Sequence, residues 1–186
     1  MGKNKSAWHD VHATDHCLPM IEHPVVVMGV AGCGKSSLGA ALAQAEGARL
    51  IEGDEHHSDA NRDKIRRGIP LTDADRAGWL DTLAAQLRSH PANTVLTCSA
   101  LKRAYRDRLR AAVPELHFVF MEIDPASARA RLEARNAHFF APSLVDSQFA
   151  ALESPVGEAG VLRLDALAPL TQLQAEASAW LRAAAR

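Results

Sequence analysis

Residues 25–38 read VVVMGVAGCGKSSL, and the arrangement of the rest of the chain can be worked out from this segment. Val25 to Met28 form a continuous apolar run rich in β-branched side chains, which predicts a strand buried on both faces. A glycine-rich turn follows. A helix is then predicted from Lys35 to Glu46, with Gly47 ending it.

The turn at residues 29–36 fits the pattern G-x-x-x-x-G-K-[ST] and lies between a predicted strand and a predicted helix. In such a turn, successive backbone N–H groups and the helix N-terminus point at an anion. We therefore expect Lys35 to reach the β- and γ-phosphates of ATP and the Ser36 hydroxyl to ligate Mg²⁺. The expected nucleotide-binding residues are Gly29, Val30, Ala31, Gly32, Cys33, Gly34, Lys35, Ser36 and Ser37.

Strands and helices alternate along the remainder of the chain, which implies an α/β fold with a parallel sheet covered on both faces. Such sheets bind ligands at the carboxyl ends of their strands. Further strands are predicted at Arg49–Glu52, Thr94–Cys98, His117–Glu122 and Val161–Leu164. Helices are predicted at 58–67, 72–89, 102–112, from 125, after 143 and at 170–184.

Composition sets the broad class. The chain has 186 residues and a net charge of -1, which excludes a nucleic-acid binder that works by bulk charge. No apolar run approaches the roughly 18 residues of a membrane helix, and the start of the chain is too polar for a secretory signal. Three cysteines predict no disulfide framework and favour a cytoplasmic location. We expect a mobile arm over residues 1–24 and one domain over residues 25–186.

A phosphate loop alone does not separate a kinase from a GTPase or an ATPase motor. The sequence has no N-K-x-D guanine signature, and the third strand ends in Thr97-Cys98-Ser99 rather than in a magnesium-binding Asp. The chain is also too short for motor machinery. A small phosphotransferase is therefore the leading class.

Asp54 follows the second predicted strand and lies on a loop separate from the phosphate loop. Phosphoryl transfer to an alcohol needs a carboxylate that orients the hydroxyl and takes its proton, and Asp54 suits this role. The alternative is a turn or cap residue. Arg76 lies on the first turns of the long helix predicted at 72–89, where it could hold an anionic acceptor or pair with Asp73 or a neighbour.

Several blocks of sequence resemble the gluconokinase family, in collinear order over about residues 25–170. The blocks after the phosphate loop are Gly53-Asp54-x-x-His57, Asn61-Arg62-x-Lys64, Gly68-Ile69-Pro70-Leu71-x-Asp73-x-Asp75-Arg76-x-x-Trp79-Leu80, Cys98-Ser99-Ala100-Leu101-Lys102-Arg103-x-Tyr105-Arg106-Asp107, His138-Phe139-Phe140 and Ser147-Gln148-Phe149-x-x-Leu152-Glu153. The Ser-Ala-Leu-Lys and His-Phe-Phe blocks are the most specific, because shikimate and adenylylsulfate kinases share the phosphate loop.

The resemblance implies ATP-dependent phosphorylation of D-gluconate at its 6-hydroxyl, giving 6-phospho-D-gluconate for carbohydrate acid metabolism. It also implies a three-layer fold like the nucleoside monophosphate kinases, with five parallel strands, a mobile lid at about residues 131–150 and often a homodimer. In the more distant shikimate kinases, the Asp after the second strand and an Arg on the following helix hold the acceptor. These positions match Asp54 and Arg76.

Gluconate is a polyol with one carboxylate, so its site needs a cation and several polar groups. Arg76, Lys102, Arg103 and Arg106 are the candidate cations, with Lys102 and Arg76 first. The alternative for the helix after Lys102 is a charged, solvated face. His57 and Gln148 are expected to read hydroxyl groups.

Arg131 and Arg135 are four residues apart and share one helix face. The resemblance implies that both close over the nucleotide with the lid and neutralise charge on the transferred phosphoryl group. His138 is expected to orient the substrate or to pack the lid. The family usually has glycine where this chain has Ala137.

Two rival functions remain open at this point. One is another small-molecule kinase, acting on shikimate or a different sugar acid. The other is a nucleotide-binding regulatory protein with weak turnover, for which Ala137 is the sole sequence support.

Cys33 carries a separate hypothesis. It lies inside the phosphate loop, beside a helix N-terminus and close to Lys35, and both features favour a reactive thiolate. We expect oxidants to inhibit the protein through Cys33, and the alternative is a small residue that fills the loop.

Overall fold

Five parallel strands form one sheet in the computed structural model, which describes residues 21–134 and 142–184. The strands lie in the order β2-β3-β1-β4-β5. All four residues of β1 are buried, which explains why this continuously apolar strand takes the centre. The strand bounds are Val25–Met28 (β1), Arg49–Glu52 (β2), Thr94–Thr97 (β3), His117–Glu122 (β4) and Val161–Asp165 (β5).

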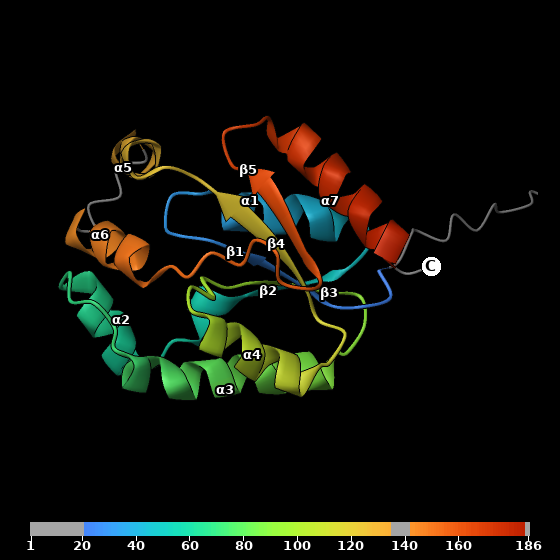
Figure 1. Cartoon of the computed structure of the whole chain (residues 1–186). Coiled ribbons are helices and arrows are strands. Elements are labelled where there is room, and N and C mark those ends of the chain that lie inside the picture. Colours follow the sequence, from blue (N-terminus) through green and yellow to red (C-terminus); the bar gives the residue numbers. More distant parts are fainter. Residues whose placement is uncertain (1–20, 135–141, 185–186) are drawn as a thin grey trace, which may run out of the picture.

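Helices cover both faces of the sheet and give the predicted three layers (Figure 1). The side chains of Val25 and Val27 face one core, built with α1 and α7, whereas Val26 and Met28 face the other, built with α3 and α4. The helix bounds are Lys35–Ala45 (α1), Asp59–Arg66 (α2), Asp73–Ser89 (α3), Arg103–Ala112 (α4), Pro125–Ala134 (α5), Pro142–Ala151 (α6) and Leu170–Ala184 (α7). The predicted α/β class and strand order along the chain are confirmed.

Side-chain caps stabilise the starts of three helices. The Ser58 side chain accepts a hydrogen bond from the backbone N–H of Asn61 at the start of α2. Thr72 and Asp75 form a reciprocal capping box at the start of α3. Asp124 accepts from the backbone N–H of Ser127 at the start of α5, and hydrogen bonds from the Ser127 side chain and backbone hold the pKa of its carboxyl below the usual range. Local sequence therefore sets where these helices begin.

The backbones of β2 and β3 approach each other closely where the two strands end. A Cβ atom on Gly53 would lie 2.1 Å from the carbonyl oxygen of Thr97, so only glycine fits this position. The Gly53 N–H donates to Thr97 Oγ1 at 3.3 Å, and the Gly53 carbonyl accepts from Trp79 Nε1 at 2.7 Å. Both backbone groups of Gly53 are thus satisfied, and the short 3-10 turn Gly53–His56 (η1) leaves the sheet in a fixed direction.

The predicted arm, residues 1–24, lies mostly outside the described residues. Its last four residues are described, and they pack on the domain. Ile21 is 4% exposed, and its carbonyl accepts from the Asn93 N–H at 3.1 Å. His23 stacks on His117 with 5.6 Å between the ring centroids. The packed part of the chain therefore begins by Ile21, four residues before the predicted domain boundary. Within the described ranges, no helix has both the length and the apolar character that crossing a membrane requires.

Arg106 on α4 is fully buried, which differs from the solvated face and from the substrate-binding role considered for this helix. Its Nη1 donates to the carbonyl oxygens of Ala100 and Leu101, both at 3.0 Å. Its Nε and Nη2 bind the two carboxylate oxygens of Glu158 at 3.1 and 2.5 Å. This pairing holds the pKa of Glu158 below its usual range. Arg106 therefore fastens the loop after β3 and is not available to a ligand.

Replacing Arg106 tests this structural role. Arg106→Met leaves the carbonyls of Ala100 and Leu101 without their buried donor and leaves Glu158 paired with Arg110 alone, so we expect the free energy of unfolding to fall by about 3 kcal/mol. The matched control is Arg108→Met on the same helix, where Arg108 makes an exposed pair with Asp81 and the expected loss is below about 1 kcal/mol. Urea unfolding measures both, and equal losses would contradict the assignment.

Candidate active site

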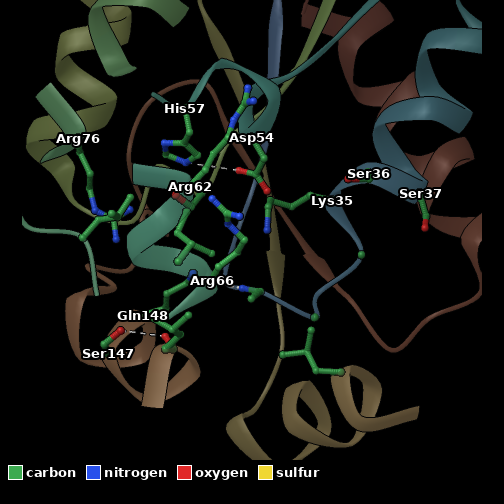
Figure 2. A pocket seen from close by; sticks show the side chains of 18 of the residues that line it. Lys35, Ser36, Ser37, Asp54, His57, Arg62, Arg66, Arg76, Ser147 and Gln148 are labelled. Carbon is green, nitrogen blue, oxygen red and sulfur yellow. Dashed lines mark hydrogen bonds and ion pairs between the residues drawn. The ribbon is translucent and has the colours of Figure 1, made fainter. Parts of the chain in front are cut away.

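One cavity of about 870 Å³ lies at the carboxyl ends of the strands, where a parallel sheet places its ligands. Figure 2 shows side chains from the phosphate loop, α2, α3 and α6 around it. Its lining residues include two groups that are far apart in sequence. The lining comprises Ala31, Gly32, Gly34, Lys35, Ser36, Ser37, Asp54, His57, Asp59, Arg62, Ile65, Arg66, Leu71, Arg76, Ser99, Leu132, Leu144, Ser147 and Gln148.

The phosphate loop joins β1 to α1 as the sequence predicts. Gly34 has a φ of 102°, a left-handed conformation that glycine adopts without strain, and the helix starts directly after it. The ammonium group of Lys35 lies across the loop, with Nζ 3.0 Å from the carbonyl oxygen of Val30. The loop thus presents backbone N–H groups, a helix N-terminus and one lysine to the cavity, which is the arrangement that binds phosphate.

A carboxylate lies beside Ser36, although the third strand supplies none. Ser36 Oγ donates to Glu52 Oε2 at 3.1 Å, and Thr97 Oγ1 donates to the same oxygen at 2.6 Å. A hydroxyl and a carboxylate are oxygen ligands of the kind Mg²⁺ prefers, and Mg²⁺ usually keeps several waters. Within residues 21–134 and 142–184, no group of three or more His, Cys, Asp or Glu side chains is arranged to hold a metal ion by itself. The donor set therefore fits a Mg²⁺ ion that a nucleotide brings with it.

Sequence reasoning missed Glu52. The third strand was expected to supply such a carboxylate, and the structure has it at the end of the neighbouring β2 instead. Glu52 pairs with Thr97 in the parallel register of β2 and β3, and the sequence does not give that register.

Asp54 lies in the turn after β2 and lines the cavity with an exposed side chain. His57 lies beside it, with Nε2 3.9 Å from Asp54 Oδ1 (Figure 2). The His57 ring stacks on Trp79 at 4.3 Å between centroids, and only 6% of its side chain is exposed. Burial lowers the pKa of His57 below 6.5, and the charges of Arg76 and Arg62 lower it further, against the opposing effect of Asp54. Burial therefore favours the neutral form of His57.

Three arginines on the acceptor side line the same cavity: Arg76 on α3, and Arg62 and Arg66 on α2. Arg62 Nη2 donates to the Glu55 carbonyl at 2.5 Å, and Arg66 makes a long exposed pair with Asp63 at 3.8 Å. Arg76 makes no ion pair with any residue of the described ranges, and its guanidinium carbon lies 5.9 Å from the Tyr105 ring centroid. The guanidinium of Arg76 could therefore bind an anionic acceptor in the cavity.

Arg62 and Arg66 were not predicted as site residues. They are four positions apart on α2, so they share one helix face, and that spacing was the available signal. They escaped notice because a short, highly charged helix usually exposes such residues to solvent.

Lys102 does not line the cavity. Its Nζ lies 2.8 Å from both carboxylate oxygens of Asp73, and the hydroxyl of Tyr105 also donates to that carboxylate. The hydrogen bonds from Lys102 and Tyr105 hold the pKa of Asp73 below its usual value. Of the two cations placed first from the sequence, the structure brings Arg76 to the cavity and leaves Lys102 paired outside it.

The remaining predicted residues lie around the phosphate loop. Gln148 on α6 accepts a hydrogen bond from the Ala31 N–H at 2.7 Å, so its carbonyl contacts the loop itself. Arg131 Nη1 and Nη2 donate to the carbonyls of Cys33 and Ala166 at 3.2 and 2.8 Å, beside the loop and not among the cavity-lining groups. Arg135, His138 and Ala137 lie outside the described residues.

Cys33 is fully buried in the phosphate loop. A reagent therefore cannot reach its sulfur in this conformation, and burial is the opposite of what a reactive thiol needs. The alternative, a small residue that fills the loop, agrees with the structure.

Comparison with known proteins gives the family. A family model described as an AAA domain matches residues 25–154. The thermosensitive gluconokinase of Escherichia coli is 39% identical over 144 residues, which is 75% of this chain and 77% of that protein. The gluconokinase of Gluconobacter oxydans is 44% identical over 145 residues, which is 75% of this chain and 80% of that protein.

A solved structure agrees with the sequence relatives. The crystal structure of a gluconokinase from Sinorhizobium meliloti superposes with a TM-score of 0.82 at 43% identity, covering 87% of this chain and 93% of that chain. The chain belongs to the gluconokinase family.

Proposed function

We propose that this protein transfers the γ-phosphoryl group of ATP to the 6-hydroxyl of D-gluconate, giving 6-phospho-D-gluconate and ADP. One observation carries the proposal beyond family membership. A single cavity holds a phosphate loop on one side and, on the other, a carboxylate and an arginine free of ion pairs within the described residues. These are the groups that a donor phosphate, an attacking hydroxyl and a substrate carboxylate require.

The donor side binds and neutralises the phosphate chain. The backbone N–H groups of the loop and the N-terminus of α1 hold the β- and γ-phosphates, and Lys35 moves from the Val30 carbonyl to the phosphate oxygens. Ser36 and Glu52 would hold Mg²⁺. When bound, this ion neutralises charge on the β- and γ-phosphates and aligns them for transfer.

The acceptor side orients gluconate. The guanidinium of Arg76 binds its carboxylate, and Arg62 and Arg66 add positive charge beside it. Asp54 accepts a hydrogen bond from the 6-hydroxyl and takes its proton as the oxygen attacks the γ-phosphorus. The bond from that phosphorus to the β–γ bridging oxygen breaks, and ADP leaves. Neutral His57 packs beside Asp54 and keeps the carboxylate turned toward the cavity.

The proposal includes a mobile lid at about residues 131–150, a range that contains part of α5 and most of α6. Gln148 on α6 already contacts the phosphate loop through Ala31. Closure of this region over the nucleotide would exclude water, which otherwise competes with gluconate as the acceptor. Arg131 and Arg135 would approach the phosphates with that movement. A cytoplasmic location and a homodimer remain predictions from the sequence.

An acceptor panel tests the function. We expect ADP release to depend on D-gluconate, and to be at least tenfold slower with shikimate or with other sugar acids, measured in a coupled assay with ATP and Mg²⁺. Tight ATP binding without acceptor-stimulated ADP release would instead identify a regulatory protein. Faster release with shikimate would identify a different small-molecule kinase.

The role of Asp54 can be tested separately from nucleotide binding. Asp54→Asn keeps the size of the side chain and removes the proton acceptor, so kcat should fall by about 10²- to 10⁴-fold. The KM for ATP should stay within about twofold, because Asp54 lies on the acceptor side. Glu55→Gln, an exposed neighbour outside the cavity, is the control and should retain full activity. An equal loss of ATP binding in Asp54→Asn would contradict the assigned role.

Arg76 and Lys102 can be ranked as carboxylate ligands. A hydrogen bond to a charged group is worth roughly 1.5–3 kcal/mol, so Arg76→Met should raise the KM for gluconate about 10- to 100-fold. Lys102→Met should change it less than about threefold, since Lys102 is already paired with Asp73 outside the cavity. Initial rates at saturating ATP measure both variants. A larger rise in the KM for gluconate with Lys102→Met than with Arg76→Met would instead assign the gluconate carboxylate to Lys102.

A further inference from the structure

The chain leaves β3 through a strained turn beside the acceptor end of the cavity. Ala100 has a φ of 43°, in the left-handed region that side chains other than glycine rarely adopt. Within the described ranges, Asn93 is the one other non-glycine residue with a positive φ. Ala100 is also fully buried. Strain of this kind persists where the surrounding structure imposes it, and it concentrates at functional sites.

The Arg106 side chain from α4 and a backbone N–H from the segment after α6 hold this turn. Buried Arg106 donates to the carbonyls of Ala100 and Leu101, and Glu158 fixes its guanidinium with two bonds. Glu153, which follows α6, adds its own N–H to the Leu101 carbonyl at 2.9 Å. These bonds keep the turn in the strained conformation that alanine alone would not favour.

The result of this geometry is the placement of Ser99. The Cys98 N–H still bonds to the Val27 carbonyl, so Ser99 is the first residue to leave the sheet. Cys98, Ala100 and Leu101 are fully buried, whereas Ser99 is 8% exposed and lines the cavity with Asp54, His57 and Arg76. The Ser99 hydroxyl has no hydrogen-bond partner among the residues that the structure describes. A small donor and acceptor group is thus held at the acceptor site with its bonding capacity free.

We propose that Ser99 determines acceptor specificity by binding a hydroxyl group of the polyol chain, and that Ala100 and Arg106 are positioning residues that aim it. The inference rests on the proposed function, since it concerns the same cavity. A serine hydroxyl both donates and accepts, which matches a polyol hydroxyl. The strained turn supplies the direction: a relaxed backbone at residue 100 would move the Ser99 hydroxyl relative to Asp54 and Arg76.

The specificity role is tested with Ser99→Ala and a set of monodeoxy-gluconates, each lacking one hydroxyl other than the 6-hydroxyl. We expect kcat/KM for gluconate to fall about three- to tenfold, with the KM for ATP unchanged. For one deoxy analogue, the one lacking the hydroxyl that Ser99 binds, the same variant should show no further loss, because the two changes remove one interaction. The same loss with every analogue would overturn the specificity role.

The positioning role is tested by two matched glycine variants. Ala100→Gly and Asn93→Gly each replace a left-handed residue by glycine, and Asn93 lies in the turn before β3, away from the cavity. We expect Ala100→Gly to raise the KM for gluconate about threefold or more, with the KM for ATP and the thermal midpoint little changed. Asn93→Gly should leave the KM for gluconate unchanged. Equal effects of the two variants on that KM, or no effect of Ala100→Gly, would overturn the positioning role.

The parent enzyme separates this inference from the function on which it rests. If it fails to phosphorylate gluconate, the proposed function is wrong, and Ser99 is then tested on whichever polyol of the acceptor panel it does use. If the parent uses gluconate and Ser99→Ala behaves like the parent on every acceptor, the function stands and the Ser99 proposal is wrong.

Discussion

The contact between Gly53 and Thr97 is the constraint on which both halves of the candidate site depend. Because the two backbones approach too closely for any side chain at residue 53, β2 and β3 end side by side, and the chain turns at one defined point. Glu52 stands just before that point and Asp54 just after it. Glu52, at the end of β2, lies beside Ser36, and Asp54, in the turn after Gly53, reaches the acceptor end of the cavity. One close approach thereby sets the spacing between the donor and acceptor groups.

Regular elements could be predicted from the sequence because their signals are local. The apolar run Val25–Met28 indicates a strand from adjacent residues, and β1 has these bounds. Thr72 and Pro125 indicate helix starts in the same local way, and α3 and α5 begin there. The phosphate loop is similarly self-contained. The family resemblance added the order of the later blocks, which composition and periodicity do not provide.

The parts that escaped prediction depend on contacts between distant segments. Arg106 looked like one of several solvated arginines on α4, and its burial comes from Glu158, which lies 52 positions away. The sequence favoured Lys102 as a substrate ligand, but the structure pairs it with Asp73, which lies 29 positions away. Glu52 acquires its place from the register of β2 and β3. Sequence spacing reports none of these pairings, because each is decided by how α3, α4 and the later loops pack.

The distribution of charge in the cavity has a consequence for how the protein meets small molecules in solution. Lys35, Arg62, Arg66 and Arg76 face one opening, in a chain whose total charge is -1. The cavity therefore attracts anions locally, while the molecule as a whole does not. Arg62 and Arg66 are exposed to solvent, so dissolved salt screens them over a Debye length of roughly 8 Å at physiological ionic strength. Phosphate or sulfate in a buffer would compete for the same guanidinium groups. The measured affinity for the sugar acid would therefore depend on which anion the buffer contains.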